Sequence, residues 1–239
     1  GGSLTYTEVT ATQTLVTNLK ANSLWTPMKA IYPMVGASAA ACAQNLKSSS
    51  FTGTFTSGWT FASTGVTPNG TSDYMDTGFI PSANLTASSQ STSFYSRSNI
   101  RNGTANDNVD LGALGSGTNS ITASLVNNVI WGFVRYGINQ DVRNLAANRY
   151  DGFFIGSRTS ATSLKLWRSN SLIGTTTISD SGITTFALYL GAENRNGTAS
   201  AFTNRQYAFA HASDGLTDTQ ASNFYTAVQA FQTTLSRQV

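Results

Sequence analysis

The acidic residues of this sequence are few, and their spacing limits the chemistry that the chain can perform. Among 239 residues there are 11 acids, and the two glutamates are Glu8 and Glu193. Glycoside hydrolysis uses two carboxylates that flank the scissile bond, about 5.5 Å apart in retaining enzymes and farther apart in inverting ones. Asp73 and Asp76 are three residues apart, so on a strand they point to opposite faces. We therefore expect no catalytic residues and no enzyme activity, with a glycosidase as the less favoured alternative.

The sequence has a single histidine, His211, and a single cysteine, Cys42. A Ser-His-Asp triad would have to use His211, but the Gly-x-Ser-x-Gly motif of such enzymes is absent. One histidine and one distant cysteine cannot close a zinc site, and no phosphate-binding G-x-x-x-x-G-K-[S/T] loop occurs. We expect His211 to be a hydrogen-bonded strand residue and Cys42 a small buried side chain, with no resident cofactor other than a possible calcium ion.

One loop is rich in side-chain oxygens, so calcium binding is an open alternative. These oxygens belong to Asn102, Asn106, Asp107, Asn108 and Asp110. Calcium needs six to eight converging oxygens, and a solvated turn has the same composition. Asp107 and Asp110 are the candidate ligands, and an ordinary turn is the favoured alternative.

Carbohydrate binding would use an aromatic ring surrounded by amides and other polar groups. The candidates are Trp131, Tyr136 and Trp167 as rings, and Asn194, Arg195, Asn196 and the loop 139–148 as polar contacts. Aromatic residues on strands more often pack into a core than form a platform. Each ring therefore has a core position as its alternative.

The composition is that of a β-protein with an uncharged polar surface. Charged residues make up 10% and hydrophobic residues 40%, and the net charge is +3. Basic residues form no run of four, which argues against nucleic-acid binding. No apolar stretch approaches the length of a membrane span, and Gly1–Ser3 show no signal-peptide pattern.

Helical patterns occur at both ends of the sequence. Near the start, Thr10 can cap a helix that carries Leu15 and Leu19 and ends at Asn22, and a short helical or irregular piece follows at 28–35. Near the end, Thr217-Asp-Thr-Gln220 is a capping box. Apolar residues at helical spacing follow it, namely Phe224, Val228, Phe231 and Leu235.

Between these ends the pattern is that of short strands separated by Gly and Asn. Candidate strands lie at 91–96, 121–125, 129–136, 152–157, 163–168, 172–178, 186–192 and 205–212. We expect one structural domain, in which an arm and helical segment (1–50) pack on a β-sandwich with a terminal helix (51–239). The Thr-rich stretch 1–9 is expected to fray unless a neighbour orders it, and the four lysines leave the sheet edges weakly protected, so we expect self-association.

Several stretches resemble one superfamily. Asn69-Gly-Thr-Ser-Asp-Tyr74 is similar to the turn and strand of laminin-G-like and concanavalin A-like sandwiches, and 163–173 resembles their "LYxNGxL" hairpin, with Ser171 where Gly is preferred. The stretch 215–225 resembles the start of their closing helix. The segments 24–36, 44–47 and 225–239 look like the opening and the end of such modules in tailed-phage virion proteins.

This resemblance implies an all-β, concanavalin A-like (laminin-G-like) jelly-roll sandwich with short N-terminal helices and an amphipathic C-terminal helix. It implies a bacteriophage virion-surface structural protein, a head or tail decoration or fibre module located on the particle. Its partners would be copies of itself, other virion proteins and host-surface glycans, without nucleic acid or membrane insertion. A stand-alone carbohydrate-binding lectin is the alternative. In hydrolases of this fold the carboxylates lie in an E-x-D-x-x-E strand, and neither glutamate here belongs to such a pattern.

Overall fold

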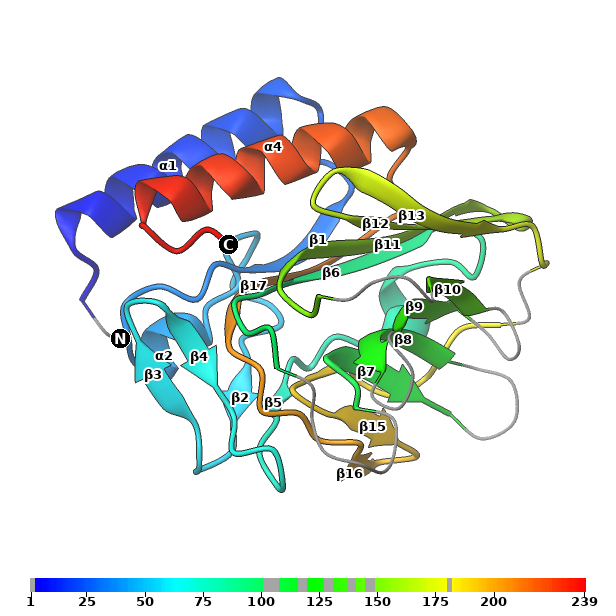
Figure 1. The fold of residues 1–239 in the computed structure, drawn as a ribbon, viewed down its shortest axis with the longest axis horizontal. Coiled ribbons are helices and arrows are strands. Elements are labelled where there is room, and N and C mark those ends of the chain that lie inside the picture. The colour runs from blue at the N-terminus through cyan, green and yellow to red at the C-terminus, as the bar shows by residue number, and fades with distance from the viewer. Residues whose placement is uncertain are drawn as a thin grey trace.

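The molecule is built in three layers. The computed structural model describes residues 3–100, 108–115, 120–126, 131–136, 141–144, 149–179 and 182–239, and in 120–126, 131–136 and 141–144 it describes the backbone. Two β-sheets lie face to face, and two long helices lie side by side across the outer face of one sheet (Figure 1). The β-sandwich with a terminal helix that the sequence predicts is confirmed.

Sheet A is the sheet beneath the helices. Its strands are β1 (Met28–Tyr32), β3 (Thr60–Ala62), β4 (Gly65–Thr67), β6 (Gln90–Ser96), β11 (Gly152–Ser160), β12 (Ser163–Arg168), β13 (Ser171–Thr176) and β17 (Tyr207–Ser213). The strand order is β13-β12-β11-β6-β17-β4-β3, and β1 also pairs with β17. Strands from the two ends of the chain therefore meet at β17.

Sheet B forms the opposite layer. Its strands are β2 (Thr54–Phe55), β5 (Met75–Asp76), β7 (Leu111–Leu114), β8 (Ser120–Val126), β9 (Trp131–Tyr136), β10 (Asp141–Asn144), β14 (Tyr189–Leu190), β15 (Glu193–Arg195) and β16 (Thr198–Ser200). The order is β10-β9-β8-β7-β14-β5-β2, with the β15–β16 hairpin beside β7. Two short helices, α2 (Ala39–Cys42) and α3 (Pro81–Asn84), lie in connections.

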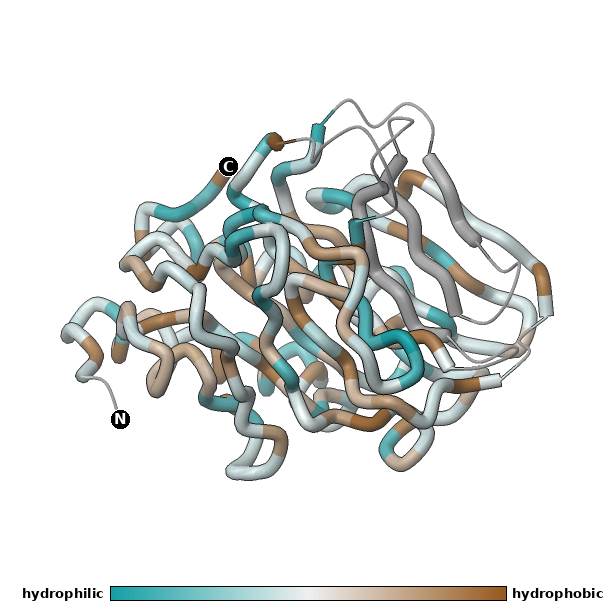
Figure 2. The backbone as a smooth tube through the Cα atoms, turned by 90° about the horizontal axis from the view of Figure 1, so that it is seen from below, coloured by the Kyte–Doolittle hydropathy of each residue, from teal (hydrophilic) through white to brown (hydrophobic). Residues whose placement is uncertain are grey.

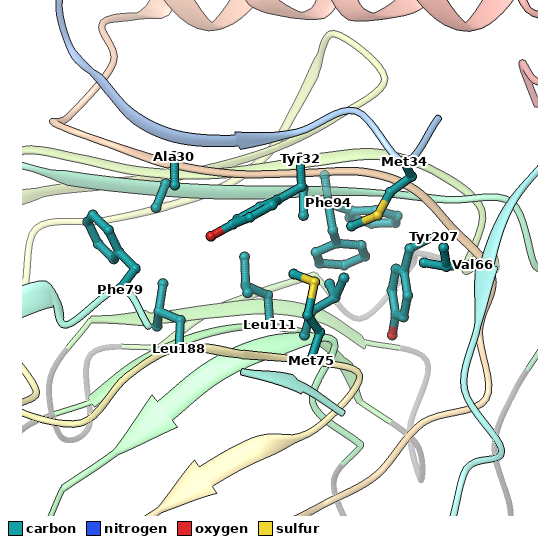
Figure 3. Packing of buried hydrophobic residues seen from close by; sticks show 14 of the residues in the cluster. Ala30, Tyr32, Met34, Val66, Met75, Phe79, Phe94, Leu111, Leu188 and Tyr207 are labelled. Atoms are coloured by element: carbon teal, nitrogen blue, oxygen red, sulfur yellow. The ribbon is translucent and has the colours of Figure 1, made fainter. Parts of the chain in front are cut away.

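The core between the sheets is apolar. Ala30, Tyr32 and Phe94 extend from sheet A, and Met75 and Leu111 extend toward them from sheet B (Figure 3). In the view from below, apolar residues are scattered along the chain and do not gather into one broad band (Figure 2). This distribution is that of a sandwich whose strands alternate between core and surface.

The first helix, α1 (Tyr6–Ala21), begins earlier than the sequence predicts. Its N-cap is Thr5, not Thr10, and Thr5 forms a capping box with Glu8. Glu8 also accepts a 2.8 Å hydrogen bond from the Gly36 N–H through its second oxygen. The expectation that residues 1–9 fray is therefore wrong for residues 5–9, because the capping box and the Gly36 contact hold them.

The segment 28–35 was expected to be helical or irregular, and this prediction is wrong for Met28–Tyr32. These residues form β1, which pairs antiparallel with β17. Ala30 and Tyr32 face the core between the sheets, whereas Met28 and Ile31 face the helices, across a register shift between Met28 and Ala30. Four of its five residues are apolar and they lie on both faces, so β1 lacks the period-two pattern of a half-buried strand and the sequence does not reveal it.

The terminal helix α4 (Asp218–Thr234) agrees with its prediction. Thr217 and Gln220 form the capping box. Phe224, Val228 and Phe231 are fully buried, and they pack with α1 and sheet A in a second core. Within the described ranges, no helix has the length and apolar content that crossing a bilayer requires.

Two buried side chains complete the helical side of the molecule. Cys42 is buried, as expected, and its thiol contacts the Val35 carbonyl at 3.4 Å. Arg237, which follows α4, is fully buried and donates to the carbonyls of Pro33 and Met34 at 3.0 and 2.7 Å. Burial lowers the pKa of the Arg237 guanidinium to about 10, so this group stays charged at neutral pH. The chain end is thus tied to the segment that follows β1.

Candidate functional site

The outer face of sheet B carries the side chains that are best placed to meet a ligand. Sheet A has its outer face under α1 and α4, with buried side chains on both sides. In sheet B, Met75 and Leu190 belong to the inter-sheet core. Successive strand residues alternate between faces, so Asp76 and Tyr189 lie on the outer face. This face is where we sought a site.

Two tyrosines stack on this face. The rings of Tyr74 and Tyr189 have centroids 4.3 Å apart and an interplanar angle of 19°. Tyr189 is 8% exposed and Tyr74 is half-buried. Tyr74 therefore covers the inner ring and presents the accessible part of the pair. Gly112, the register partner of Tyr189 on β7, places no side chain beside it.

A carboxylate lies next to the tyrosine pair. Asp76 is the register partner of both Tyr189 and the exposed Thr54. Its carboxylate accepts the Gly78 N–H at 2.8 Å, which fixes its position. Burial, followed by the nearby Asp76 and Tyr74, raises the pKa of the Tyr189 phenol to about 12. The phenol therefore stays protonated, as a hydrogen-bond donor, throughout the physiological range.

The β15–β16 hairpin adds a guanidinium to the same face of the sheet. Glu193 is a register partner of Gly112, and Arg195 is the partner of Leu114, two residues further along β7. Arg195 donates to one Glu193 oxygen at 3.0 and 2.7 Å, and it keeps 51% of its side chain exposed, compared with 5% for Glu193. The face thus offers a ring, a carboxylate and a guanidinium, the groups that hydrogen-bond and stack on a sugar.

The other predicted polar contacts serve the hairpin itself. Asn194 is buried, donates to the Ala187 carbonyl at 3.0 Å and accepts the Gly197 N–H at 2.9 Å. Asn196 and Gly197 have φ angles of 52° and 87°, the left-handed backbone that Asn-Gly pairs adopt in tight hairpin turns. Of the predicted polar residues, Arg195 is the one whose described contacts leave a charged group exposed on this face of sheet B.

The predicted aromatic platforms are placed differently. Trp167 is 7% exposed and packs in the core between sheet A and the helices, which is the core position that the sequence analysis gave as its alternative. Trp131 and Tyr136 lie on β9, opposite Val126 and Ile121. Their side chains, and the loops 137–140 and 145–148, lie outside the described residues.

The calcium candidates do not form a cluster in the described part of the chain. Asp107 lies outside the described residues. Asp110 is fully buried and ion-paired with Arg205, with both its oxygens 3.0 Å from one guanidinium nitrogen, and it accepts the Tyr207 hydroxyl at 2.6 Å. Within the described ranges, no three His, Cys, Asp or Glu residues converge to hold a metal ion. Arg205 gives the Asp110 carboxylate a cation partner, and calcium binding through Asp107 stays a prediction.

The remaining ionisable candidates have structural contacts. His211 is fully buried, with its ring nitrogens in contact with the hydroxyls of Ser93 and Ser213, and burial lowers its pKa to about 3. The imidazole is therefore neutral and closed to solvent, in agreement with the expected hydrogen-bonded strand residue. Asp73 accepts the N–H groups of Gly58 and Asn69 at 3.2 and 2.9 Å.

Sequence reasoning missed the tyrosine pair. A local signal was present, since Tyr74 and Asp76 flank the apolar Met75, and Tyr189 lies between Leu188 and Leu190. This alternation shows which residues share a face. It does not show that two strands so distant in sequence both pair along the same edge, and the stack depends on that pairing.

Known structures share this fold. No protein-family model and no curated protein sequence matches the chain. Domain 4 of AbnA, a GH43 extracellular arabinanase from Geobacillus stearothermophilus solved with arabinotriose, is similar, with a TM-score of 0.54 and 14% identity over 83% of this chain and 98% of that domain. A Trypanosoma rangeli sialidase mutant displaying trans-sialidase activity gives a TM-score of 0.56 at 8% identity, over 91% of this chain and 38% of the sialidase.

The binding domain of Paraclostridial Mosquitocidal Protein 1 is also similar, with a TM-score of 0.53 and 11% identity over 76% of this chain and 48% of that one. These likenesses show a β-sandwich. At such identities they show the fold alone, so the function has to be argued from the site.

Proposed function

We propose that this protein is a carbohydrate-binding β-sandwich module and that its ligand lies on the outer face of sheet B. The observation that carries the proposal is the stacked pair of Tyr74 and Tyr189 beside Asp76. The similar arabinanase domain, solved with arabinotriose, and the similar toxin binding domain support it.

The chemistry of the face suits a saccharide. The C–H faces of a sugar ring pack on an aromatic ring, and Tyr74 presents such a ring, held in place by Tyr189 beneath it. Sugar hydroxyls donate to a carboxylate and accept from a guanidinium, and Asp76 and Arg195 supply both groups. Since Tyr189 and the backbone hold these side chains, little freedom is lost on binding.

A glycan panel that includes arabinan oligosaccharides, read by titration calorimetry, tests the proposal. Tyr74→Ala should weaken binding by at least about tenfold, as expected for loss of an aromatic contact. Tyr225→Ala is the matched control, because Tyr225 is also a half-buried tyrosine but lies on α4, in the opposite layer. Equal affinity of Tyr74→Ala and the parent protein, or no binding to any glycan, contradicts the proposal.

We further propose that the module binds without catalysis. Asp76 and Glu193 lie in the same row of sheet B, but Arg195 donates two hydrogen bonds to one Glu193 oxygen, so the guanidinium already occupies that carboxylate. The purified protein should release no reducing sugar from the same glycan panel. Turnover that is lost in Asp76→Asn would show that it is a glycosidase.

For the location we propose the surface of a phage particle, with self-association. The resemblance of the opening and closing stretches to virion modules supports the location. An apolar groove of about 190 Å³, lined by Leu4, Thr12, Pro33, Val35, Ala40, Ala41, Gln44 and Leu46, supports self-association. Tyr6, 86% exposed at the start of α1, adds exposed aromatic surface on the helix that contributes Thr12 to the groove. Light scattering should show an oligomer that Tyr6→Ser weakens, and a monomer at all concentrations contradicts this proposal.

A further inference from the structure

Two of the four lysines in the sequence lie over one tryptophan, and the charge of a third acts on one of these two. Lys20 lies in the last turn of α1, Lys29 lies in β1, and Lys47 follows α2. The ammonium nitrogens of Lys47 and Lys20 lie 4.6 and 5.4 Å from the centroid of the half-buried Trp25 ring. We call Lys20, Trp25, Lys29 and Lys47 the lysine cluster. The elements α1 and β1, which carry Lys20 and Lys29, belong to the helix layer and to the sheet beneath it (Figure 1).

The backbone holds this cluster in place. The Lys47 ammonium donates to the Trp25 carbonyl at 2.6 Å. The Asn45 side-chain oxygen accepts the N–H groups of both Ile31 and Lys47, at 2.9 and 3.0 Å, so the loop that carries Lys47 is fastened to β1. Fixed ammonium groups lose less entropy when an anion arrives than freely rotating ones do.

The charges of the cluster are not balanced. Lys29 pairs with Asp214 at 2.9 Å, and both side chains keep about a third of their surface exposed, 32% and 39%. Among the described residues, Lys20 and Lys47 have no carboxylate partner. Burial, followed by the charges of Lys29 and Lys20, lowers the pKa of the Lys47 ammonium. Like charges held this close repel one another, and an anion between them removes that repulsion.

We propose that the lysine cluster binds the sulfate or carboxylate groups of an acidic polysaccharide. Two ammonium groups already cover the Trp25 ring, so the ligand meets cationic groups there and not a bare aromatic face. Three lysines in a compact group suit one or two oxyanions on a sugar chain. A nucleic-acid site calls for a longer basic stripe along the phosphate backbone.

This inference extends the proposed carbohydrate-binding function and adds a second, separate site to it. The cluster lies beside α1 and β1, whereas Tyr74 and Tyr189 lie on the far face of sheet B, with the sandwich between them. Loss of binding at one of the two sites should therefore leave binding at the other unchanged. A neutral glycan tests the tyrosine pair, and a sulfated one tests the lysine cluster.

The test measures binding of a labelled heparin oligosaccharide to the whole chain and to two charge variants. Lys20→Gln/Lys47→Gln should weaken binding by about tenfold or more, and affinity for the parent protein should fall as salt rises, since exposed charges are screened. Lys165→Gln is the control, because Lys165 is the fourth lysine and pairs with Asp218 at 2.7 Å away from the cluster. It should change the affinity by less than about twofold, as expected for an exposed ion pair.

Several outcomes overturn the inference. If heparin does not bind the parent protein, or if it binds Lys165→Gln as weakly as it binds Lys20→Gln/Lys47→Gln, the lysine cluster is not a binding site for the polysaccharide. If oligothymidylate binds as tightly as heparin and loses affinity in the same lysine variant, the lysine cluster is a nucleic-acid site. Tyr74→Ala should leave heparin binding unchanged, so loss of neutral-glycan binding and loss of heparin binding are told apart. Circular dichroism melting of each variant confirms that it is folded.

Discussion

The central strands of sheet A, β6 and β17, are buried on both faces, whereas sheet B is buried on one face and carries partly exposed polar and aromatic groups on the other. All seven residues of β6 in sheet A are buried, and its hydroxyls are used internally: Ser91 donates to Gly156 and Ser93 contacts His211. In sheet B, Thr54, Tyr74 and Asp76 remain at least partly exposed. The sheet that the helices cover therefore serves to stabilise the fold, whereas the outer face of the other sheet stays accessible.

The largest expected effect falls on the covered side. Phe231 is 2% exposed and packs edge-on against Phe209 at 6.5 Å. Phe231→Ala should lower the free energy of unfolding by about 3–5 kcal/mol, as for large buried aromatics. Urea unfolding measures it. A loss below about 1 kcal/mol, typical of a surface residue, would mean that the helix layer contributes little and that the contrast between the sheets does not hold.

The next effect concerns the contact between the sheets at Asp110. The Tyr207 hydroxyl from β17 donates to the Asp110 carboxylate at 2.6 Å, and both residues are fully buried. Tyr207→Phe removes this donor and keeps the ring, so it should lower the free energy of unfolding by about 1–3 kcal/mol. Tyr74→Phe on the exposed face is the control, and it should change stability by less than about 0.5 kcal/mol. Equal losses would remove the distinction between the buried and the exposed face.

The pH dependence of the free energy of unfolding tests the same contrast between the buried and the exposed side. His211 lies between Ser93 and Ser213 and under Phe224, and burial lowers its pKa from 6.5 to about 3. Between these two pKa values the imidazole therefore binds a proton in the unfolded chain but not in the folded one. Stability is complete above pH 6.5 and falls as the pH drops toward 3. Between pH 6.5 and 5.5 the loss should be about 1 kcal/mol.

Unfolding of the parent chain and of His211→Asn at a series of pH values measures this loss. The carboxylates titrate mainly below this window, so a variant without the imidazole should show a nearly flat stability between pH 5.5 and 6.5. An unchanged slope in the variant would assign the pH dependence to other groups.

The smallest effect is expected at the edge of sheet A. Leu172 on β13 is 50% exposed although it belongs to the covered sheet. Leu172→Thr should change the free energy of unfolding by less than about 0.5 kcal/mol, as for ordinary surface positions. A larger loss, seen together with a smaller particle in light scattering, would show that this edge is covered by another copy of the chain.

Local rules predicted local features well. The capping box at Thr217 and the helical spacing of Phe224 and Phe231 predicted α4, and the turn at Asn196-Gly197 follows an equally local rule. These signals depend on residues that are near one another in sequence. The physics that produces them acts within one turn of helix or one hairpin, so the sequence shows it directly.

Features that depend on the whole fold could not be predicted from the sequence. The segment 28–32 shows no alternation that identifies a strand, because β1 places apolar side chains on both of its faces. The serines of β6 are polar, yet hydrogen bonds across sheet A satisfy them in the interior. The tyrosine pair needs strands β5 and β14 to be neighbours, and no local pattern in the sequence specifies that pairing.

Arg237 sets the order in which the fold can be completed during synthesis. Its guanidinium holds the carbonyls of Pro33, Met34 and Ala208, and its own carbonyl accepts a 2.7 Å hydrogen bond from Arg97. Pro33 and Met34 therefore gain these contacts only after residue 237 has been synthesised. β1 gains its partner β17 earlier, once residues 207–213 have been made, and until then its apolar side chains lack that cover. We expect the nascent chain to rely on chaperones over this interval, and its native structure to form only after translation has passed residue 237.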